Sequence, residues 1–316
     1  MHDGNRFLRR RRRQLAFAAL GTASLVAVDV LARSARAQAA SLAAAQANVL
    51  PATTQSASAA RVVSVGGALT EIVFALGAES MLVGSDTTSL YPPAAQQTPK
   101  VGYARALSAE GVLSLRPTVL LATAEAGPPA VIAQLTSAGV HVVRARNGHG
   151  FEVLFANVQT VGEALQRPIE AQRLSAQLQS SWRDVRGAIK VPSKPPRVLF
   201  VLSHVATNVQ VSGEATAAAT MISLAGAVNA LSGFKGYRPL TAEAAVAAAP
   251  DLILTTAQGA EAVGGTDRLL AQPGLALTPA GRARRVLALD ALYLLGGGPR
   301  LPQAVADLAR FAGTLT

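Results

Sequence analysis

The sequence contains no cysteine, so neither a disulfide framework nor a thiolate metal site is available to it. Beyond the N-terminal region there are three histidines, His141, His149 and His204, and none of them has H-x-x-H or H-E-x-x-H spacing. The absence of these metal-binding spacings argues against a zinc hydrolase. No apolar run in that part of the chain reaches the roughly 20 residues of a transmembrane helix without a charge, glycine or proline. We therefore expect the mature protein to be soluble.

The N-terminal segment has the composition of an export signal. Five consecutive arginines at 9–13 precede an apolar run at 15–28, and the small residues Ala35 and Ala37 follow. A positive region, a short apolar region and an A-x-A site are typical of a cleaved secretory signal. We expect residues 1–37 to be a signal peptide cleaved near Ala37. The arginine run fits the twin-arginine route as well as the general secretory route, and an uncleaved N-terminal anchor is the alternative.

The positive charge of the chain is concentrated in that segment. The formal net charge is +11, and residues 1–37 carry +6 of it, which leaves +5 on the remainder. The remainder has no basic cluster of the kind that nucleic-acid binding requires. A modest positive net charge suits an anionic small ligand.

Strands and helices are predicted to alternate along most of the remainder. A leader at 38–60 is rich in alanine, serine and glutamine and lacks bulky apolar periodicity. Strands are predicted at 61–65, 81–84, 119–122 and 140–143, and helices at 68–76, 108–115 and 129–137. This alternation predicts an α/β fold with a largely parallel sheet.

A long helical stretch then separates two such regions. Helical spacing of apolar residues extends from Phe151 to Ile189, Pro168 divides it, and strand-type sequence resumes at 198–202. We predict two α/β lobes, at 61–165 and 195–316. One long helix near 169–190, within a linking segment at 166–194, joins them.

An internal repeat relates the two lobes. Residues 107–121 (LSAEGVLSLRPTVLL) and 240–254 (LTAEAAVAAAPDLIL) align at a constant offset of 133. Each copy has a capping Ser or Thr, a first-turn glutamate, a proline and a following strand. The glutamates are Glu110 and Glu243, and an upstream arginine, Arg105 or Arg238, is repeated at the same offset. Two equivalent lobes predict a ligand cleft between them.

Polar residues on predicted loops are the candidates for binding. Tyr91 lies before Pro92–Pro93, which we expect to exclude a helix and to stiffen a loop at the carboxyl end of a strand. Arg105 and Arg238 lie on predicted polar loops and could bind carboxylates through their guanidinium groups. A structural role for Tyr91 and a plain surface role for the arginines are the alternatives.

No arrangement of residues indicates catalysis. Ser203–His204 has no evident orienting carboxylate, and Gly296–Gly298 lacks the Lys and Ser/Thr of a phosphate loop. The residues themselves therefore predict no catalytic site.

These residues resemble a known family. The mature chain is similar to the haem-binding periplasmic proteins of bacterial haem-uptake ABC transporters, a group that also includes cobalamin and ferric-siderophore binders. The resemblance covers residues 61–316. It rests on the motifs RVVSVGG at 61–67, SLYP at 89–92, VGYARAL at 101–107, SAEGVLSLRP at 108–117 and AGPP at 126–129. It implies a class III periplasmic binding protein fold, in which two lobes and one linking helix enclose the cleft.

The resemblance also implies a role for four of the candidate residues. Tyr91 is expected to be the axial ligand of haem iron, and Arg238 to approach the haem from the second lobe. Tyr103, Arg105 and Tyr237 are candidates for contact with the haem or its propionates because of their positions on the neighbouring polar loops. The glutamates Glu110 and Glu243 are expected to dock on the permease.

The protein that this resemblance implies is a monomer in the periplasm. It captures haem (hemin) and delivers it to an inner-membrane ABC permease dimer with its ATPase. The alternatives are a ferric-siderophore or cobalamin binder of the same class and a periplasmic α/β hydrolase that uses Ser203 or His204. A purely structural envelope protein is a third alternative.

Overall fold

The computed structural model describes residues 60–203 and 209–315. The predicted signal peptide with its cleavage near Ala37, most of the predicted leader and His204 lie outside these residues. Within the described part of the chain, no helix combines the length and the apolar character needed to cross a membrane.

The N-terminal lobe is built on a parallel sheet with the strand order β2-β1-β5-β6. Its strands are β1 (Val62–Val65), β2 (Leu82–Ser85), β5 (Val119–Ala122) and β6 (His141–Arg144). All four predicted strands of this region are therefore confirmed, with ends that differ by one residue at most.

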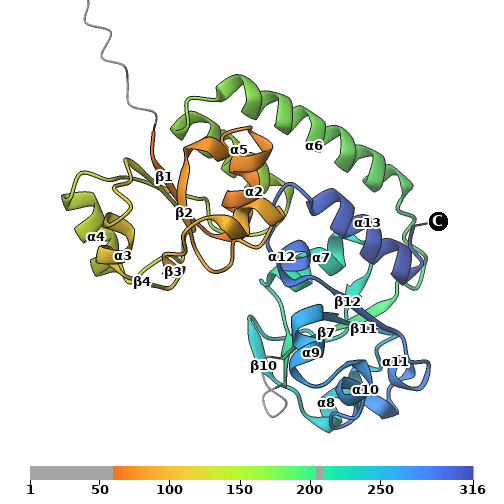
Figure 1. Cartoon of the computed structure of the whole chain (residues 1–316). Coiled ribbons are helices and arrows are strands. Elements are labelled where there is room, and N and C mark those ends of the chain that lie inside the picture. The colour runs from red at the N-terminus through yellow and green to blue at the C-terminus, as the bar shows by residue number, and fades with distance from the viewer. Residues whose placement is uncertain (1–59, 204–208, 316) are drawn as a thin grey trace, which may run out of the picture. The chain divides into compact units, whose positions relative to one another are not determined.

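Helices cover both faces of this sheet (Figure 1). They are α2 (Gly67–Ala75), α3 (Ala109–Leu113), α4 (Pro129–Ser137) and α5 (Phe151–Ala164). Successive strand side chains alternate between the two faces: Val62 belongs to the apolar cluster beneath α2 and α5, and Val63 to the cluster beneath α3 and α4. Ser108 caps α3 as predicted, because its Oγ accepts a hydrogen bond from the Gly111 N–H at 3.3 Å.

Two short elements lie between β2 and α3. A 3₁₀ helix, η2 (Pro93–Gln97), begins inside the Pro-Pro pair, so the prediction that this pair excludes a helix is wrong. Proline fits the first helical turn, where its missing N–H removes no helical hydrogen bond. A hairpin of β3 (Gly102–Tyr103) and β4 (Ala106–Leu107) follows, where we predicted a loop around Arg105. A further 3₁₀ helix, η1 (Glu79–Met81), precedes β2.

One long helix, α6 (Pro168–Ala188), joins the lobes, as predicted from the periodicity. It packs against α5 of the N-terminal lobe and against α13 (Leu301–Ala312) of the C-terminal lobe. Figure 1 shows α6 running from one lobe to the other. Its 21 residues span about 30 Å, at 1.5 Å per residue.

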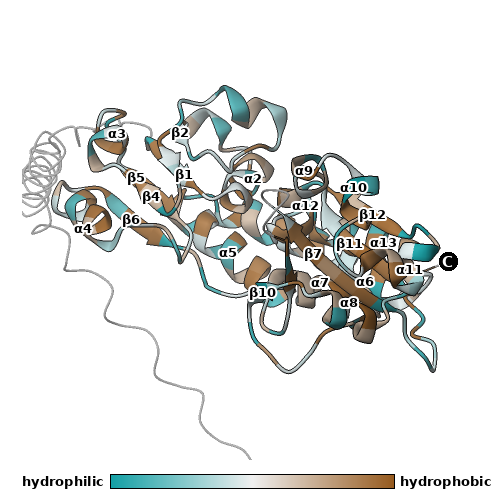
Figure 2. Cartoon of the chain, turned by 90° about the horizontal axis from the view of Figure 1, so that it is seen from below, coloured by the Kyte–Doolittle hydropathy of each residue, from teal (hydrophilic) through white to brown (hydrophobic). Residues whose placement is uncertain are grey.

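The C-terminal lobe contains a mixed sheet with the order β10-β8-β7-β11-β12, and β9 also pairs with β7. Its strands are β7 (Arg197–Ser203), β8 (Val209–Ser212), β9 (Val228–Asn229), β10 (Tyr237–Pro239), β11 (Leu252–Thr256) and β12 (Val286–Leu289). Strands β8 and β10 are antiparallel additions, and the other pairings are parallel. Figure 2 shows the hydrophobic character of the central strand β7.

Short helices surround this second sheet. They are α7 (Ala217–Leu224), α8 (Ala242–Ala248), α9 (Ala257–Ala262), α10 (Thr266–Leu270), η3 (Leu275–Leu277), α11 (Pro279–Arg282), α12 (Ala291–Leu295) and α13. The sequence repeat has a structural counterpart, because α8 precedes β11 as α3 precedes β5. Thr241 caps α8 by accepting from the Ala244 N–H at 3.1 Å, as Ser108 caps α3.

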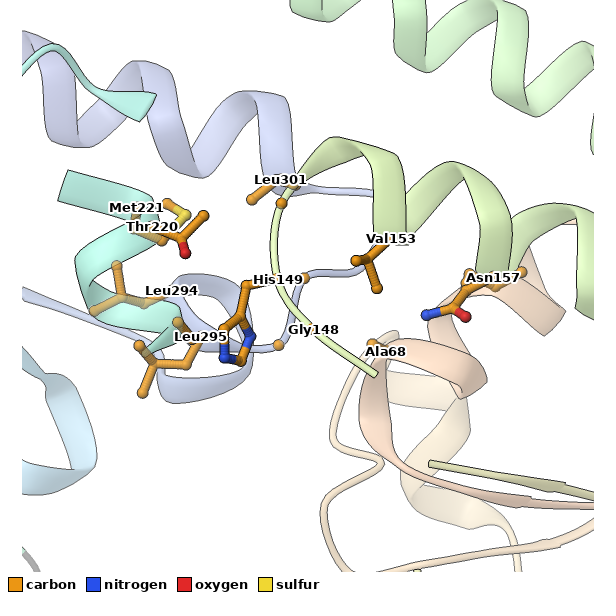
Figure 3. Close-up of a pocket in the computed structure, with 15 residues that line it drawn as sticks. Ala68, Gly148, His149, Val153, Asn157, Thr220, Met221, Leu294, Leu295 and Leu301 are labelled. Carbon is orange, nitrogen blue, oxygen red and sulfur yellow. The ribbon is translucent and has the colours of Figure 1, made fainter. Parts of the chain in front are cut away.

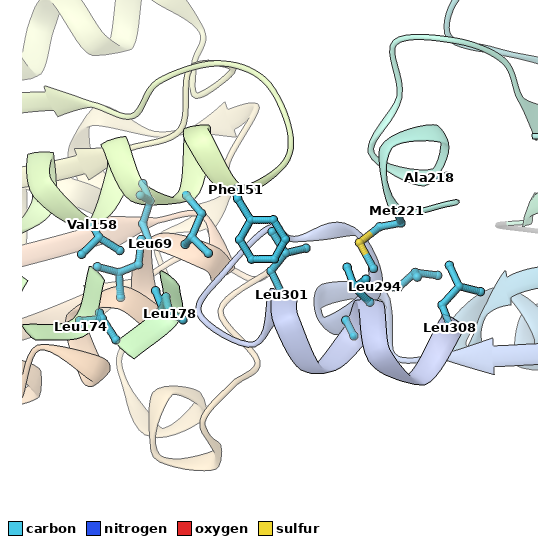
Figure 4. Packing of buried hydrophobic residues seen from close by; sticks show 14 of the residues in the cluster. Leu69, Phe151, Val158, Leu174, Leu178, Ala218, Met221, Leu294, Leu301 and Leu308 are labelled. Atoms are coloured by element: carbon cyan, nitrogen blue, oxygen red, sulfur yellow. The ribbon is translucent and has the colours of Figure 1, made fainter. Parts of the chain in front are cut away.

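A single apolar cluster extends through both lobes. It includes Leu69 of α2 and Phe151 of α5 on one side, and Met221 of α7 and Leu301 of α13 on the other. Figure 4 shows Phe151 and Leu301 near the middle of this cluster. The Phe151 ring stacks on Trp182 of α6, with 4.1 Å between the ring centroids. The faces of the two lobes that border α6 thus share one core.

We expect little movement of the lobes when ligand binds, because bending at the linking helix would break this shared core. X-ray scattering of the protein before and after addition of haem, the ligand that the resemblance implies, should give radii of gyration that agree within experimental error. A clear contraction on loading would contradict a rigid connection through α6.

Candidate functional site

A network of buried hydrogen bonds fixes the loop that carries Tyr91. The Asp86 side chain is fully buried and accepts hydrogen bonds from the Gly66 N–H at 3.0 Å, Thr88 Oγ1 at 2.7 Å and Ser89 Oγ at 2.8 Å. A buried carboxylate is tolerated where hydrogen bonds satisfy it in this way. The network ties residues 86–89 to the start of α2, at the carboxyl end of β1.

Lys100 holds the same loop through a second set of hydrogen bonds. Its Nζ donates to Ser85 Oγ at 2.8 Å, to the Ala95 carbonyl at 2.9 Å and to the Ser89 carbonyl at 3.3 Å. Desolvation lowers the pKa of Lys100 below its ordinary value, and the nearby Asp86 opposes this change. The backbone that leads to Tyr91 is therefore held by hydrogen bonds of both Asp86 and Lys100.

Tyr91 itself is 42% exposed. The guanidinium carbon of Arg300 lies 3.6 Å from the centroid of its ring. This distance is well within the range of a cation–π interaction. Among the hydrogen bonds of the described residues, none involves the Tyr91 hydroxyl, so this oxygen is available to a ligand.

Arg300 comes from the C-terminal lobe and is paired with the N-terminal lobe. Its Nε and Nη2 donate to the two carboxylate oxygens of Glu71, at 2.9 and 2.7 Å. The Glu71 side chain, on α2, is only 3% exposed. Burial raises the pKa of Glu71, and the charge and hydrogen bonds of Arg300 offset part of this rise. Burial alone would lower the pKa of Arg300, yet Glu71 raises it overall.

The other predicted cations are not brought to Tyr91. Arg105 is exposed and forms an ion pair with Glu125 of its own lobe. The Arg238 guanidinium carbon lies 3.9 Å from the centroid of the Phe234 ring. In the described part of the chain, no hydrogen bond, ion pair or ring contact joins either arginine to Tyr91.

Arg238 lies on a strand, so its predicted position on a loop is wrong. It belongs to β10, which pairs antiparallel with β8 through Arg238 opposite Val211. Its neighbour Tyr237 is 38% exposed and packs edge-on against Phe200, with 6.4 Å between centroids. A three-residue edge strand that ends in proline has too little alternation to be recognised from sequence.

Tyr103 and the two repeated glutamates lie on the surface. Tyr103, in the β3–β4 hairpin, is 46% exposed. Glu110 and Glu243 are both exposed, each in the first turn of its helix. The helix dipole favours a carboxylate in the first turn, which accounts for each glutamate separately. It does not explain why both lobes carry one at the same position.

A small cavity lies between the lobes (Figure 3). Its volume is about 60 Å³, and its walls include Ala68, Val153, Thr220, Met221, Leu294 and Leu301. His149 also borders it and is itself exposed. Ligand pockets usually measure about 300–1,000 Å³, so this cavity alone does not hold a macrocycle.

Comparison with known proteins agrees with a fold of two lobes joined by one long helix. A family model described as periplasmic binding protein matches residues 62–293. The chain belongs to the periplasmic binding protein family.

Three individual proteins are similar to this chain. The solved structure of the periplasmic haem-binding protein BhuT in complex with two haems is 51% identical, covers 81% of this chain and 99% of that chain, and superimposes with a TM-score of 0.78. YvrC of Bacillus subtilis, an uncharacterised ABC transporter substrate-binding lipoprotein, is 29% identical over 79% of this chain and 78% of its own. A vitamin B12-binding protein of Vibrio cholerae is 24% identical over 46% of this chain and 52% of its own.

Sequence reasoning missed Arg300 and Glu71. Two signals point to them in hindsight. Glu71 is a charge on the apolar helix 68–76, and a buried charge needs a partner. The run Gly296–Gly298 directly precedes Pro299 and Arg300, and a Cβ at Gly298 would lie 3.2 Å from the Glu71 carboxylate. The glycine therefore permits the close approach that brings Arg300 to Glu71.

Proposed function

We propose that this periplasmic binding protein captures haem and delivers it to an ABC importer. The observation that carries the proposal is the 51% identity to the haem-binding protein BhuT over nearly all of that protein's length. The chain acts as a binding component and supplies no catalytic group. In this proposal the signal peptide is removed near Ala37, and the mature protein works as a monomer in the periplasm.

Tyr91 is the proposed axial ligand of the haem iron. Ferric iron is a hard cation that accepts anionic oxygen ligands, and tyrosinate is one of the axial ligands that haem iron takes in proteins. The Tyr91 ring is partly exposed, and its loop is anchored through Asp86 and Lys100. These features suit a residue that presents one oxygen to a large incoming ligand.

Arg238 is the proposed partner of a haem propionate. Its guanidinium is not committed to a carboxylate among the described residues, and it is exposed over the Phe234 ring. Arg105, by contrast, is already paired with Glu125. Tyr103 and Tyr237, both partly exposed, are the proposed contacts for the remainder of the haem edge.

Glu110 and Glu243 are the proposed docking residues for the permease dimer, which works with its ATPase. Each is exposed and occupies the same position in the repeated helix of its lobe. A two-fold related pair of carboxylates suits a dimeric partner that offers one cationic site on each subunit.

Titration with hemin tests the proposal directly. The apo-protein should develop a Soret band and the charge-transfer bands of a high-spin ferric tyrosinate complex, at saturable stoichiometry. Cyanocobalamin and a ferric siderophore serve as competing ligands. Binding of either of these without a haem spectrum would replace haem by the alternative ligand of the same class.

Substitution of Arg238 should weaken haem binding by a moderate factor. Arg238→Ala removes a charge-assisted hydrogen bond to a propionate, and such bonds contribute about 1.5–3 kcal/mol, or roughly ten- to hundredfold in affinity. The tyrosinate bands should stay in place, because the iron–oxygen bond remains. Haem affinity equal to that of the unmodified protein would exclude Arg238 from propionate binding.

The hydrolase alternative finds no support at Ser203. Its side chain is only 2% exposed, and its partner in that hypothesis, His204, lies outside the described residues. A buried hydroxyl is not placed to attack a substrate that enters from solvent.

A further inference from the structure

The cation of Arg300 is enclosed by groups from both lobes. Its guanidinium carbon lies 3.6 Å from the Tyr91 ring centroid and 5.1 Å from that of Tyr293. Its two-point ion pair with the buried Glu71 fixes the plane of the guanidinium group. Tyr293 is itself held by a hydrogen bond of 2.9 Å from its hydroxyl to Asp307. Arg300 is thus a rigid cation beside the proposed iron ligand.

We propose that Arg300, oriented by Glu71, is a positioning residue that holds the ring of Tyr91 for axial ligation of haem iron. This inference rests on the proposed function. It assigns to the C-terminal lobe a part in ligation, although the ligand itself belongs to the N-terminal lobe.

The contacts of Tyr91 support this role. The Asp86 network and Lys100 fix the backbone of its loop, but none of these hydrogen bonds involves the Tyr91 side chain, which is 42% exposed. Within the described residues, the ring of Tyr91 has one cation–π contact, that with Arg300. A cation over one ring face leaves the hydroxyl and the other face free for the iron and the macrocycle. It also stabilises the negative charge on the oxygen that binds Fe(III).

The placement of Arg300 depends on an unusual local sequence. The side chain of Arg300 is 25% exposed, and that of Glu71 is 3% exposed. A Cβ at Gly298 would approach the Glu71 carboxylate to 3.2 Å, and a Cβ at Gly67 would lie 2.6 Å from Leu292. Gly67 therefore allows α12 to approach the start of α2, and Gly298 allows the loop before α13 to approach Glu71, which brings Arg300 to Tyr91.

The test removes the cation without leaving a buried carboxylate alone. Removal of one partner of a buried ion pair is strongly destabilising, whereas replacement of both is tolerated better. The variant is therefore Glu71→Gln with Arg300→Gln, compared with Glu71→Gln alone and with Arg300→Lys. Arg285→Gln is the matched control, because Arg285 also lies over an aromatic ring, Phe311 at 5.8 Å, within the C-terminal lobe.

The measurements are the haem release rate, the electron paramagnetic resonance of the high-spin ferric complex, and the melting temperature. The double variant should release hemin about tenfold faster, in line with the loss of one cation–π contact. Its resonance near g = 6 should broaden or split, because the ring orientation relative to the iron is no longer fixed. Arg300→Lys keeps a cation at this position, so it should release hemin more slowly than the double variant but faster than the unmodified protein. Arg285→Gln should match the unmodified protein in both the release rate and the resonance.

Three results would overturn the inference. A native release rate and resonance in the double variant, with tyrosinate bands lost in Tyr91→Phe, would refute the role of Arg300 and leave the proposed function intact. Faster release that only follows a lower melting temperature, with a native resonance, would assign Arg300 a structural role. Native bands in Tyr91→Phe would refute the axial ligand and this inference together.

Discussion

Reversing the charge of both Glu110 and Glu243 to lysine is expected to abolish haem import by the reconstituted transporter while haem affinity changes by less than about twofold. Both glutamates are exposed and lie at the start of equivalent helices, 133 residues apart. Attraction between opposite charges speeds encounter and selects the partner, and like charges placed together cost several kcal/mol. Two reversals should therefore lower import by more than about a hundredfold. The measurement is uptake of hemin into proteoliposomes that contain the permease and its ATPase.

A matched pair separates docking from net charge. Glu163 and Glu261 are also exposed, one on each lobe, so Glu163→Lys with Glu261→Lys makes the same change in charge at other places. This control pair should keep most of the import activity. Equal loss of import in both pairs would indicate a general charge effect. Loss of haem binding in the first pair would place its glutamates in the binding cleft and contradict the docking role.

Much of the fold was predictable because local signals and the repeat agree with each other. Strand β5 was predicted at its observed ends, and α6 within two residues of them. Strand β5 is an unbroken apolar run that follows Pro117, and α6 begins at Pro168 and has apolar residues at helical spacing. The repeat predicted two lobes, and α3 with β5 and α8 with β11 confirm it. Apolar periodicity and end signals are enough to predict a helix or strand when its own sequence determines which of its faces is buried.

The site was less predictable because its contacts join distant segments. Arg300 and Glu71 are 229 residues apart in sequence, and no local pattern connects them. Arg105 was expected in the cleft as the counterpart of Arg238, but a neighbouring carboxylate, Glu125, pairs with it. The repeat correctly aligned the two arginines in sequence, yet one lies in a hairpin turn and the other on an edge strand. The repeat therefore predicts the helix and the strand that both lobes share, whereas the backbone before that helix and the partners of its side chains differ between the lobes.

Replacement of Tyr91 by phenylalanine is expected to have the largest effect on haem itself. Tyr91→Phe keeps the ring, and with it the contact to Arg300, but removes the oxygen proposed to bind the iron. The backbone of the loop should stay in place, because Asp86 and Lys100 hold it without using the Tyr91 hydroxyl. The variant should therefore fold normally, lose the tyrosinate charge-transfer bands, and release hemin more than about a hundredfold faster. This effect exceeds that of a single charge-assisted hydrogen bond, which is about ten- to hundredfold.

Tyr103→Phe provides the comparison for this result. Tyr103 is 46% exposed, close to the 42% of Tyr91, so both substitutions remove one hydroxyl from a partly exposed ring. Tyr103→Phe should keep the tyrosinate bands, because a contact at the haem edge does not ligate the iron. Absorption spectra and stopped-flow transfer of hemin to apomyoglobin measure both effects. If Tyr91→Phe and Tyr103→Phe gave the same spectra and release rates, Tyr91 would be a packing residue of its loop, and the iron would take its axial ligand from another side chain.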